Sequence, residues 1–252
     1  MHTPNNLPEK ELTQLRIDLA AAFRLAVKFD WHESVGNHFS AAVSADGKRF
    51  LLNPKWKHFS EICASDLLLL DADDSAPTLG DDQSKIVDKS AWCIHGAVHK
   101  INPKARVVLH LHPPYATALA SLKDPTLYPI DQNTARFFGM GVDNSFGGMA
   151  DSPEEGRRIG KALLESNTLI MRNHGVTIIG KSVAEAFEDM YFFERAAKTL
   201  MLAYASGQPL SIMSDQLASE TAKSWHSYQG AAYSHFDYLK RQLDATDDTY
   251  KY

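Results

Sequence analysis

The sequence predicts an α/β protein in which helices alternate with short strands. Three observations support this class: a helical periodicity near the N-terminus, two pairs of β-rich segments joined by tight turns, and two long helical segments towards the C-terminus. The chain has 252 residues, of which 44% are hydrophobic, so it can bury a substantial core. We expect residues 1–252 to form a single domain, with C-terminal helices from about residue 183.

The first hundred residues predict a helix, a hairpin, a further strand and a second helix. Apolar residues recur at helical spacing over residues 9–29. Residues 38–43 and 49–52 are β-rich and flank the pair Asp46-Gly47, a strong hairpin signal. The remaining expectations are a short strand over 67–70, a polar loop through Gly80 and Asp81, and a helix over 84–100.

The rest of the chain predicts a buried strand, a second hairpin and three helices. Residues 107–112 form an apolar run that Pro113 and Pro114 end, and a new element follows over 115–122. A proline and two acidic residues begin a helix over 153–164. Residues 168–171 and 176–179 flank a turn at 172–175, and 183–205 and 215–243 predict two long closing helices.

The strongest functional signal is a pair of histidines at the end of the apolar strand. Side chains at positions i and i+2 share one face of a strand, so His110 and His112 point the same way. Two imidazoles rarely suffice for a transition metal. His174 lies in a predicted tight turn, and Gly175 after it permits close approach of the backbone. The sequence therefore predicts a metal site formed by His110, His112 and His174.

A second histidine pair has an alternative explanation. His95 and His99 have the i, i+4 spacing of helical zinc sites, but no glutamate lies between them as in the metalloprotease pattern. Apolar residues such as Trp92 and Ile94 surround them, which favours a packed helix with hydrogen-bonded core histidines. The same structural explanation remains open for His110 and His112.

Composition excludes several classes of partner. The net charge is −5 and no basic stripe is present, so we expect neither nucleic acid nor an anionic membrane as a principal partner. Cys63 and Cys93 are too few for a disulfide framework. The N-terminal residues do not resemble a signal peptide, and no apolar run approaches the roughly 20 residues of a spanning helix. We expect a cytoplasmic protein.

Five motifs follow one another over about residues 15–207: Gly36-Asn37 followed by Ser40, Leu51-Leu52-Asn53-Pro54, His95, His110-x-His112 and Asn173-His174-Gly175. In this order they resemble the N-terminal signature, the strand entering the substrate loop, the helix histidine, the metal strand and the third-ligand turn of the class II aldolase/adducin family. The resemblance implies a three-layer α/β/α fold around a central, mostly antiparallel sheet. It also implies one divalent metal per subunit, with zinc expected and manganese or iron as alternatives, and a homotetramer with sites at subunit interfaces.

Three positions depart from the family pattern. Family aldolases carry a serine-glutamate step where this chain has Ser90-Ala91, so the acid/base carboxylate is missing. Their proton-donating tyrosine falls near Gln132. Lys55-Trp56 replaces the threonine-glycine pair that binds substrate phosphate. Lys55 could instead hold a carboxylate and Trp56 could cover an aromatic or apolar substrate, unless this segment is simply a solvated loop.

These matches and departures predict a metal-dependent lyase for a small hydroxy- or keto-acid, by aldol cleavage or decarboxylation, and not a standard sugar-phosphate aldolase. Two groups of residues complete the prediction. Asn37, Lys55, Trp56, Ser90 and Gln132 are expected to contact a small carboxylate or carbonyl substrate. Arg136, Tyr115 and Asp131 are the catalytic candidates, Arg136 as a carboxylate clamp. Alternatively, Tyr115 only packs and Arg136 pairs with Asp131.

Two other functions remain open. One is an adducin-like, non-catalytic interaction protein, and the other is a non-haem iron oxygenase on the same fold. An enzyme is favoured because a purely structural protein has no physical need to bring three imidazoles together.

Overall fold

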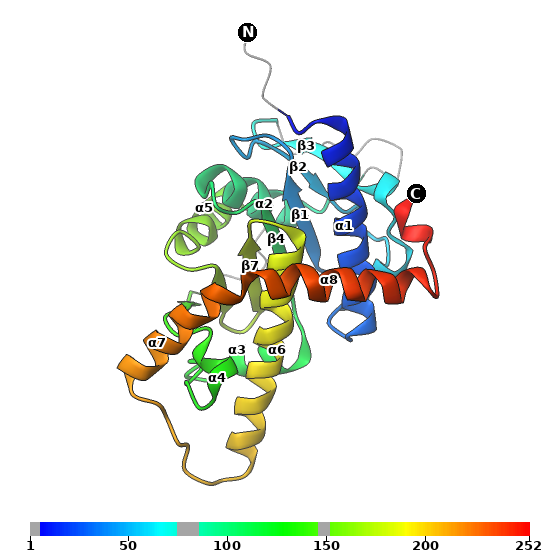
Figure 1. Cartoon of the computed structure of the whole chain (residues 1–252). Helices are drawn as coiled ribbons and strands as arrows, with labels where there is room; N and C mark the ends of the chain where they lie inside the picture. The colour runs from blue at the N-terminus through cyan, green and yellow to red at the C-terminus, as the bar shows by residue number, and fades with distance from the viewer. Residues whose placement is uncertain (1–5, 75–85, 146–151) are drawn as a thin grey trace.

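A seven-stranded sheet forms the centre of the molecule, in the strand order β3-β2-β1-β4-β7-β6-β5 (Figure 1). The structure is a computed structural model and describes residues 6–74, 86–145 and 152–252. Neighbouring strands pair antiparallel, except β5 and β6, which are parallel. The strands are β1 (His38–Ala42), β2 (Arg49–Leu52), β3 (Leu68–Asp71), β4 (Val107–Leu111), β5 (Gly141–Asp143), β6 (Thr168–Met171) and β7 (Gly175–Gly180).

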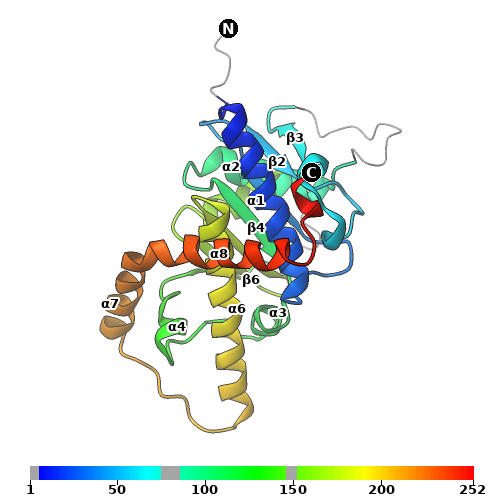
Figure 2. The same cartoon turned by 45° about the vertical axis from the view of Figure 1, so that its right-hand side comes forward.

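Helices cover both faces of this sheet, as Figures 1 and 2 show from two directions. Helices α1 (Glu9–Lys28) and α6 (Val183–Ala205) pack on one face, and α8 (Gln229–Asp244) lies across α6. Helices α2 (Lys89–Ile101) and α5 (Pro153–Ala162) pack against each other over the opposite face. The three-layer α/β/α arrangement around a mostly antiparallel sheet is therefore confirmed.

The short elements lie between these layers and at their ends. Among the described residues they are α3 (Pro114–Ala120), α4 (Gln132–Ala135), α7 (Asp215–Trp225) and the 3-10 turns η1 (Phe59–Glu61), η2 (Ala64–Asp66), η4 (His226–Tyr228) and η5 (Thr249–Lys251). No helix in the described ranges combines the length and apolar character that crossing a membrane requires.

Strand β4 shows how the sequence distributes side chains between the layers. Leu109 and Leu111 belong to the core that α1 and α6 form, whereas Val108 packs with residues of α2 and α5. Because side chains alternate along a strand, His110 lies on the same face as Val108, towards α2. The β1–β4 register places His38 directly opposite His110. The face of the sheet that α2 covers is therefore rich in imidazoles where β1 begins and β4 ends.

The two predicted hairpins are confirmed. Strands β1 and β2 pair around the Asp46-Gly47 turn, in which Gly47 has a φ of 74°. Strands β6 and β7 pair around the turn that holds His174. The helices predicted over 9–29, 153–164 and 183–205 are also present, with ends shifted by two residues or fewer.

Two helix predictions need correction. The segment 215–243 is not one helix, because η4 separates α7 from α8. Helix α7 packs against α4, whereas α8 buries Ala232, Phe236 and Leu239 against the body of the molecule, and one straight helix cannot serve both surfaces. Helix α2 begins at Lys89, after the capping residue Asp88, and not at 84. Residues 84 and 85, and the polar loop predicted through Gly80 and Asp81, lie outside the described residues.

Candidate metal centre

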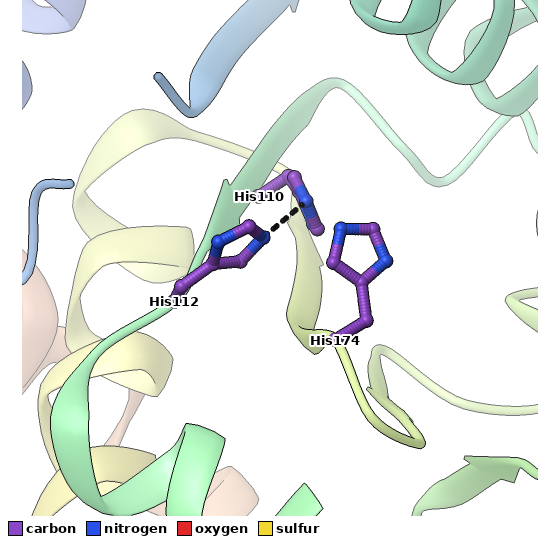
Figure 3. A group of neighbouring side chains, drawn as sticks. All are labelled: His110, His112 and His174. Atoms are coloured by element: carbon purple, nitrogen blue, oxygen red, sulfur yellow. Dashed lines mark hydrogen bonds between the residues drawn. The ribbon is translucent and has the colours of Figure 1, made fainter. Parts of the chain in front are cut away.

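Three histidines from two parts of the chain converge at the C-terminal end of β4, in the middle of the sheet (Figure 3). His110 is the fourth residue of β4, His112 directly follows the strand, and His174 lies in the turn between β6 and β7. Because β7 pairs with β4, that turn comes beside the end of β4. One nitrogen from each ring lies within 4.8 Å of the others, so the predicted triad is assembled.

The turn that carries His174 is fixed by the backbone around it. Asn173 has a φ of 56°, and its N–H donates to the carbonyl of Ala120 at 2.9 Å. A Cβ on Gly175 would lie 2.5 Å from the Cδ2 atom of His112 and 2.5 Å from the carbonyl oxygen of Leu111. Glycine is therefore required for the close approach that brings the turn against His112.

Hydrogen bonds orient two of the three rings. The Nδ1 atom of His112 lies 2.5 Å from a carboxylate oxygen of Glu33. Because a carboxylate only accepts, Nδ1 of His112 carries the hydrogen and Nε2 keeps its lone pair. The Nδ1 atom of His110 lies 3.0 Å from the Thr177 hydroxyl, which can also donate to the sulfur of Met171 at 3.3 Å. With that hydroxyl turned to Met171, His110 also offers its Nε2 lone pair.

The spacing of these donor atoms fits a metal ion. The Nε2 atoms of His110 and His112 are 3.1 Å apart. Two nitrogens at about 2.0–2.1 Å from a tetrahedral zinc ion are separated by about 3.3 Å, close to this value. Two opposed lone pairs at such a distance repel unless a cation or a proton lies between them. The donor set therefore suits a divalent metal with a histidine-rich site.

The surroundings also favour the neutral imidazoles that metals bind. Burial lowers the pKa of His110 well below its ordinary value, and the neighbouring rings lower it further. Burial, assisted by His112, lowers the pKa of His174 to about 4. Both rings therefore remain unprotonated at neutral pH.

The helical pair His95 and His99 belongs to a buried hydrogen-bonded chain, as the packing interpretation predicts. His38 Nδ1 lies 2.7 Å from His95 Nε2, the other His95 nitrogen contacts the Ser40 hydroxyl, and that hydroxyl lies 2.7 Å from His99 Nε2. His99 Nδ1 meets the carbonyl of Ala105 at 2.6 Å. Within the described ranges, the three-residue group able to hold a metal is His110, His112 and His174.

Three of the predicted substrate residues lie near the N-terminus of α2. Asp88 caps this helix by accepting from the backbone N–H groups of Ser90 and Ala91, and it forms an ion pair with Lys55 at 3.0 Å. Burial would raise the pKa of Asp88, but the Ser90 hydrogen bond and Lys55 outweigh it and lower that pKa to about 2. Lys55 also lies 4.4 Å from the ring centre of Trp56, whose side chain is 62% exposed.

Asn37 differs from these residues because its side chain is buried without a hydrogen bond. Both its amide nitrogen and its amide oxygen lack a partner, and its backbone φ is 68°. Buried polar atoms are normally satisfied, and a non-glycine residue at positive φ is strained. Such a residue beside His38 is typical of a ligand-binding position.

The predicted catalytic residues Asp131 and Arg136 cap the two ends of α4, and within the described ranges the hydrogen bonds and ion pairs of their side chains do not reach the histidines. Arg136 forms an ion pair with Asp189 at 2.6 Å, so the alternative explanation, a pairing with Asp131, is wrong. Asp131 caps α4, and the carbonyl of the exposed Gln132 accepts from the Trp225 indole at 2.9 Å. Their catalytic roles and the substrate contact of Gln132 stay predictions.

Tyr115 lies closer to the triad in sequence, at the start of α3. Its backbone N–H donates to the carboxylate of Glu194 at 2.9 Å, and Lys198 lies 5.1 Å from its ring centre. Burial raises the pKa of Glu194 to about 7, although hydrogen bonds from the α3 backbone oppose this. The contacts of Tyr115 are those of a packed residue, and its catalytic role also stays a prediction.

Sequence reasoning missed three residues beside the histidines: Glu33, His38 and Asp88. Glu33 lies in the irregular segment after α1, where no periodicity applies. His38 is recognisable only through the β1–β4 register, which joins distant parts of the chain. Asp88 had a usable signal, because aspartate is one of the preferred residues at the N-cap of a helix.

The fold and this histidine cluster together define a class: three-layer α/β/α proteins in which three imidazoles suited to a divalent metal converge at the end of a central strand. The family model described as the class II aldolase and adducin N-terminal domain matches residues 17–201. The chain therefore belongs to the class II aldolase and adducin family. Class II aldolases depend on a divalent metal, which agrees with the donor set.

Individual relatives come from both branches of this family. A Caulobacter vibrioides protein assigned to aldolase class 2 is 30% identical over 210 residues, which cover 83% of this chain and 80% of that protein. An adducin-related protein of Schizosaccharomyces pombe is 28% identical over 249 residues, which cover 94% of this chain and 76% of that protein. The crystal structure of an aldolase II superfamily protein from Pseudomonas syringae superposes with a TM-score of 0.86 at 28% identity, covering 98% of each chain.

Proposed function

We propose that this protein is a metal-dependent lyase of the class II aldolase type that acts on a small hydroxy- or keto-acid. The reaction would be aldol cleavage or decarboxylation, with zinc as the expected metal. The observation that carries the proposal is the triad of His110, His112 and His174, whose ligand atoms lie within 4.8 Å of one another. A divalent ion held there supplies a Lewis acid that stabilises negative charge developing on a substrate oxygen.

The protein's own residues would prepare the site for this chemistry. Glu33 holds His112 with Nε2 free, and Thr177 can do the same for His110. Three neutral imidazoles leave the charge of the ion undiminished and leave coordination positions for substrate. A carboxylate with a neighbouring hydroxyl or carbonyl oxygen offers two oxygens to such positions, which supports a hydroxy- or keto-acid.

The surroundings of α2 argue against a standard sugar-phosphate aldolase. Ala91 stands where family aldolases carry the acid/base glutamate, and it is buried in an apolar cluster with Phe50, Leu52 and Val87. The first N–H groups of α2 are already bonded to Asp88, which also neutralises Lys55. A phosphate at this helix end would meet a carboxylate.

Elemental analysis followed by thermal-shift measurements tests the proposal. We expect one divalent metal per chain and a rise in melting temperature when small hydroxy- and keto-acids are added. His112→Ala should lose the metal and the response to the acids. The matched control is His235→Ala, which removes an imidazole paired with Glu188 on the opposite helical layer and should keep both. A metal-free wild type, or an unchanged response in His112→Ala, would contradict a metal-centred pocket.

An adducin-like interaction protein is the second candidate, favoured by the similarity to the adducin-related protein and by the absence of a carboxylate at Ala91. Metal content separates the two functions. Purified protein that neither contains a divalent metal nor gains stability from added zinc would support the interaction protein, because its histidines would then have no metal to hold.

We also propose that the chain folds as one domain and assembles as a homotetramer with sites at subunit interfaces. The C-terminal turn η5 packs on α1 with Tyr250 fully buried, which supports a single domain. Apolar side chains at the far end of α6 and in the following segment are half exposed, among them Leu202 and Ile212. Such exposed apolar groups support an association surface. Light scattering that gives a monomer would overturn the assembly.

A further inference from the structure

His38 is a fourth imidazole beside the candidate metal centre, although it is not one of the metal-binding group. Its ring stacks on His110 with centroids 4.9 Å apart and planes at 25°. The charges of Asp88, His112 and His174 all act on it. His38 therefore contacts the histidine triad and also interacts with the residue that caps α2.

The series of buried hydrogen bonds that starts at His38 fixes which nitrogen of His38 carries the hydrogen. This series ends at the carbonyl of Ala105, which can only accept, so His99 donates through Nδ1. Burial keeps His99 neutral, and its Nε2 must then accept from the Ser40 hydroxyl. That hydroxyl has a single hydrogen, so it accepts from Nδ1 of His95.

The same reasoning passes one step further, to His38. With its hydrogen on Nδ1, neutral His95 offers an Nε2 lone pair, and His38 must donate to it through its own Nδ1. The Nε2 atom of neutral His38 therefore carries a lone pair. Within the described part of the chain, no hydrogen bond to this atom is formed, and His38 is 8% exposed. The Nε2 lone pair of His38 is therefore left for a ligand or solvent to donate to.

The neighbouring residue shows the same deficit. Both polar atoms of the Asn37 side chain are buried without a hydrogen bond. Asn37 thus leaves a buried amide unsatisfied next to His38, whose Nε2 forms no hydrogen bond within the described residues. The nearby carboxylate of Asp88 is paired with Lys55 at 3.0 Å, so the preference at this point comes from the lone pair of His38. A lone pair needs a partner that donates a hydrogen bond, which a hydroxyl group does and an ionised phosphate does not.

Building on the function proposed above, we propose that Nε2 of His38 accepts a hydrogen bond from a substrate hydroxyl at the end remote from the metal. His38 would then determine specificity. It would favour acids with a second, distal hydroxyl over deoxy analogues, and over analogues with a phosphate at that end.

Binding measurements on the zinc-loaded wild type and two variants test this role. The probes are lactate, glycerate, threonate and 3-phosphoglycerate, which share a carboxylate and an adjacent hydroxyl and differ at the distal end. Calorimetry should show glycerate or threonate binding about tenfold or more tighter than lactate, since a buried acceptor left unpaired costs affinity. Phosphoglycerate should bind more weakly than glycerate.

The variants assign this preference to His38. His38→Phe keeps a flat ring against His110 but has no acceptor, so it should retain zinc and lose the preference for the hydroxylated acids. His38→Gln keeps both a donor for His95 and an acceptor, so it should retain much of the preference. Solid-state 15N spectra of histidine-labelled protein, with and without His38, should show the hydrogen of His38 on Nδ1.

The outcomes separate this role from the proposed function. Equal binding of lactate and the hydroxylated acids, an unchanged preference in His38→Phe, or a hydrogen on Nε2 would overturn the role of His38 and leave the metal-dependent function intact. Binding of none of the acids by the zinc-loaded protein would overturn both.

Discussion

Glu33 accepts a hydrogen bond from the ring nitrogen of His112 that faces away from the candidate metal. Such carboxylate–histidine pairs set the tautomer and orientation of a ligand, and their loss lowers metal affinity by about 10–100-fold. We expect Glu33→Gln to weaken zinc binding within this range while the melting temperature of the metal-free protein changes little, because Glu33 is exposed. Competition with a chelating dye measures the affinity.

The exposed Glu61 provides the control for Glu33. It lies in η1, and Glu61→Gln removes the same charge while leaving the contact between Glu33 and His112 in place. If both variants bind zinc like the wild type, the contact between Glu33 and His112 has no role in holding the ligand.

Gly175 is the second residue on which the site depends. A methyl group at this position would lie 2.5 Å from both the ring of His112 and the carbonyl oxygen of Leu111, so the turn would have to move. Gly175→Ala should therefore lower zinc affinity and also destabilise the fold, by roughly 1–3 kcal/mol as for other overpacked positions. Chemical denaturation and zinc titration measure the two effects.

Gly230 offers a matched comparison, since a methyl group there meets nothing within 4 Å. Gly230→Ala should be neutral or slightly stabilising, because alanine is the better helix former. A Gly175→Ala protein as stable and as metal-competent as Gly230→Ala would refute the steric role of the glycine.

His110 and His112 were predictable as a pair from sequence because their geometry is local. Two histidines at i and i+2 on a strand share a face whatever the strand pairs with. The position of His38 was not predictable in this way, since it depends on the register of two strands distant in sequence. Glu33 reaches His112 from an irregular segment, for which pattern rules give no orientation.

At the level of elements, the start of α2 couples helix capping to an ion pair. Asp88 accepts from two backbone N–H groups and contacts Lys55. Asp88→Ala should cost about 0.5–2 kcal/mol of folding stability, the usual value of such a cap. Asp88→Asn retains a capping oxygen and removes the charge, so its smaller loss isolates the cap from the ion pair. Urea denaturation at neutral pH measures the stability of both variants. If they lose the same amount, the loss comes from the ion pair with Lys55 and not from the cap.

The elements that sequence reasoning misplaced share a physical reason. The break at His226–Tyr228 is decided by the two different surfaces that α7 and α8 cover, and a helical periodicity does not reveal it. Strand β5 has three residues and α4 has four, too few for a period to show. The hairpins were predictable, because their turn residues and flanking strands are contiguous.

For the whole molecule, the buried histidines make stability dependent on pH. Burial lowers the pKa of His99 from 6.5 to about 4, helped by the charge of Arg106, and burial lowers that of His95 well below its ordinary value. At pH values below the ordinary pKa of histidine, these imidazoles bind protons in the unfolded chain but stay neutral in the folded chain. The contribution of the neutral imidazoles to the free energy of unfolding should therefore be fully present above about pH 6.5 and fall as the pH approaches 4. For His99 alone the loss is on the order of 3 kcal/mol.

Urea denaturation at several pH values, with a chelator present to remove any metal contribution, checks this dependence. His99→Gln should show a shallower fall because one of the titrating groups is gone. A free energy of unfolding that stays constant between about pH 7 and pH 5 would show that the buried imidazoles are not held neutral.

The assembly of the triad from β4 and the β6–β7 turn has a kinetic consequence. The ligands come together only after β4 has paired with β7 and β7 with β6, and the first pairing joins distant parts of the chain. Contacts between such distant segments form late, because their loop-closure entropy is paid before they are made. A bound ion would therefore leave the refolding rate nearly unchanged and slow unfolding, since it stabilises contacts that are absent from the transition state. The metal would therefore increase the kinetic stability of the folded protein without helping it to fold.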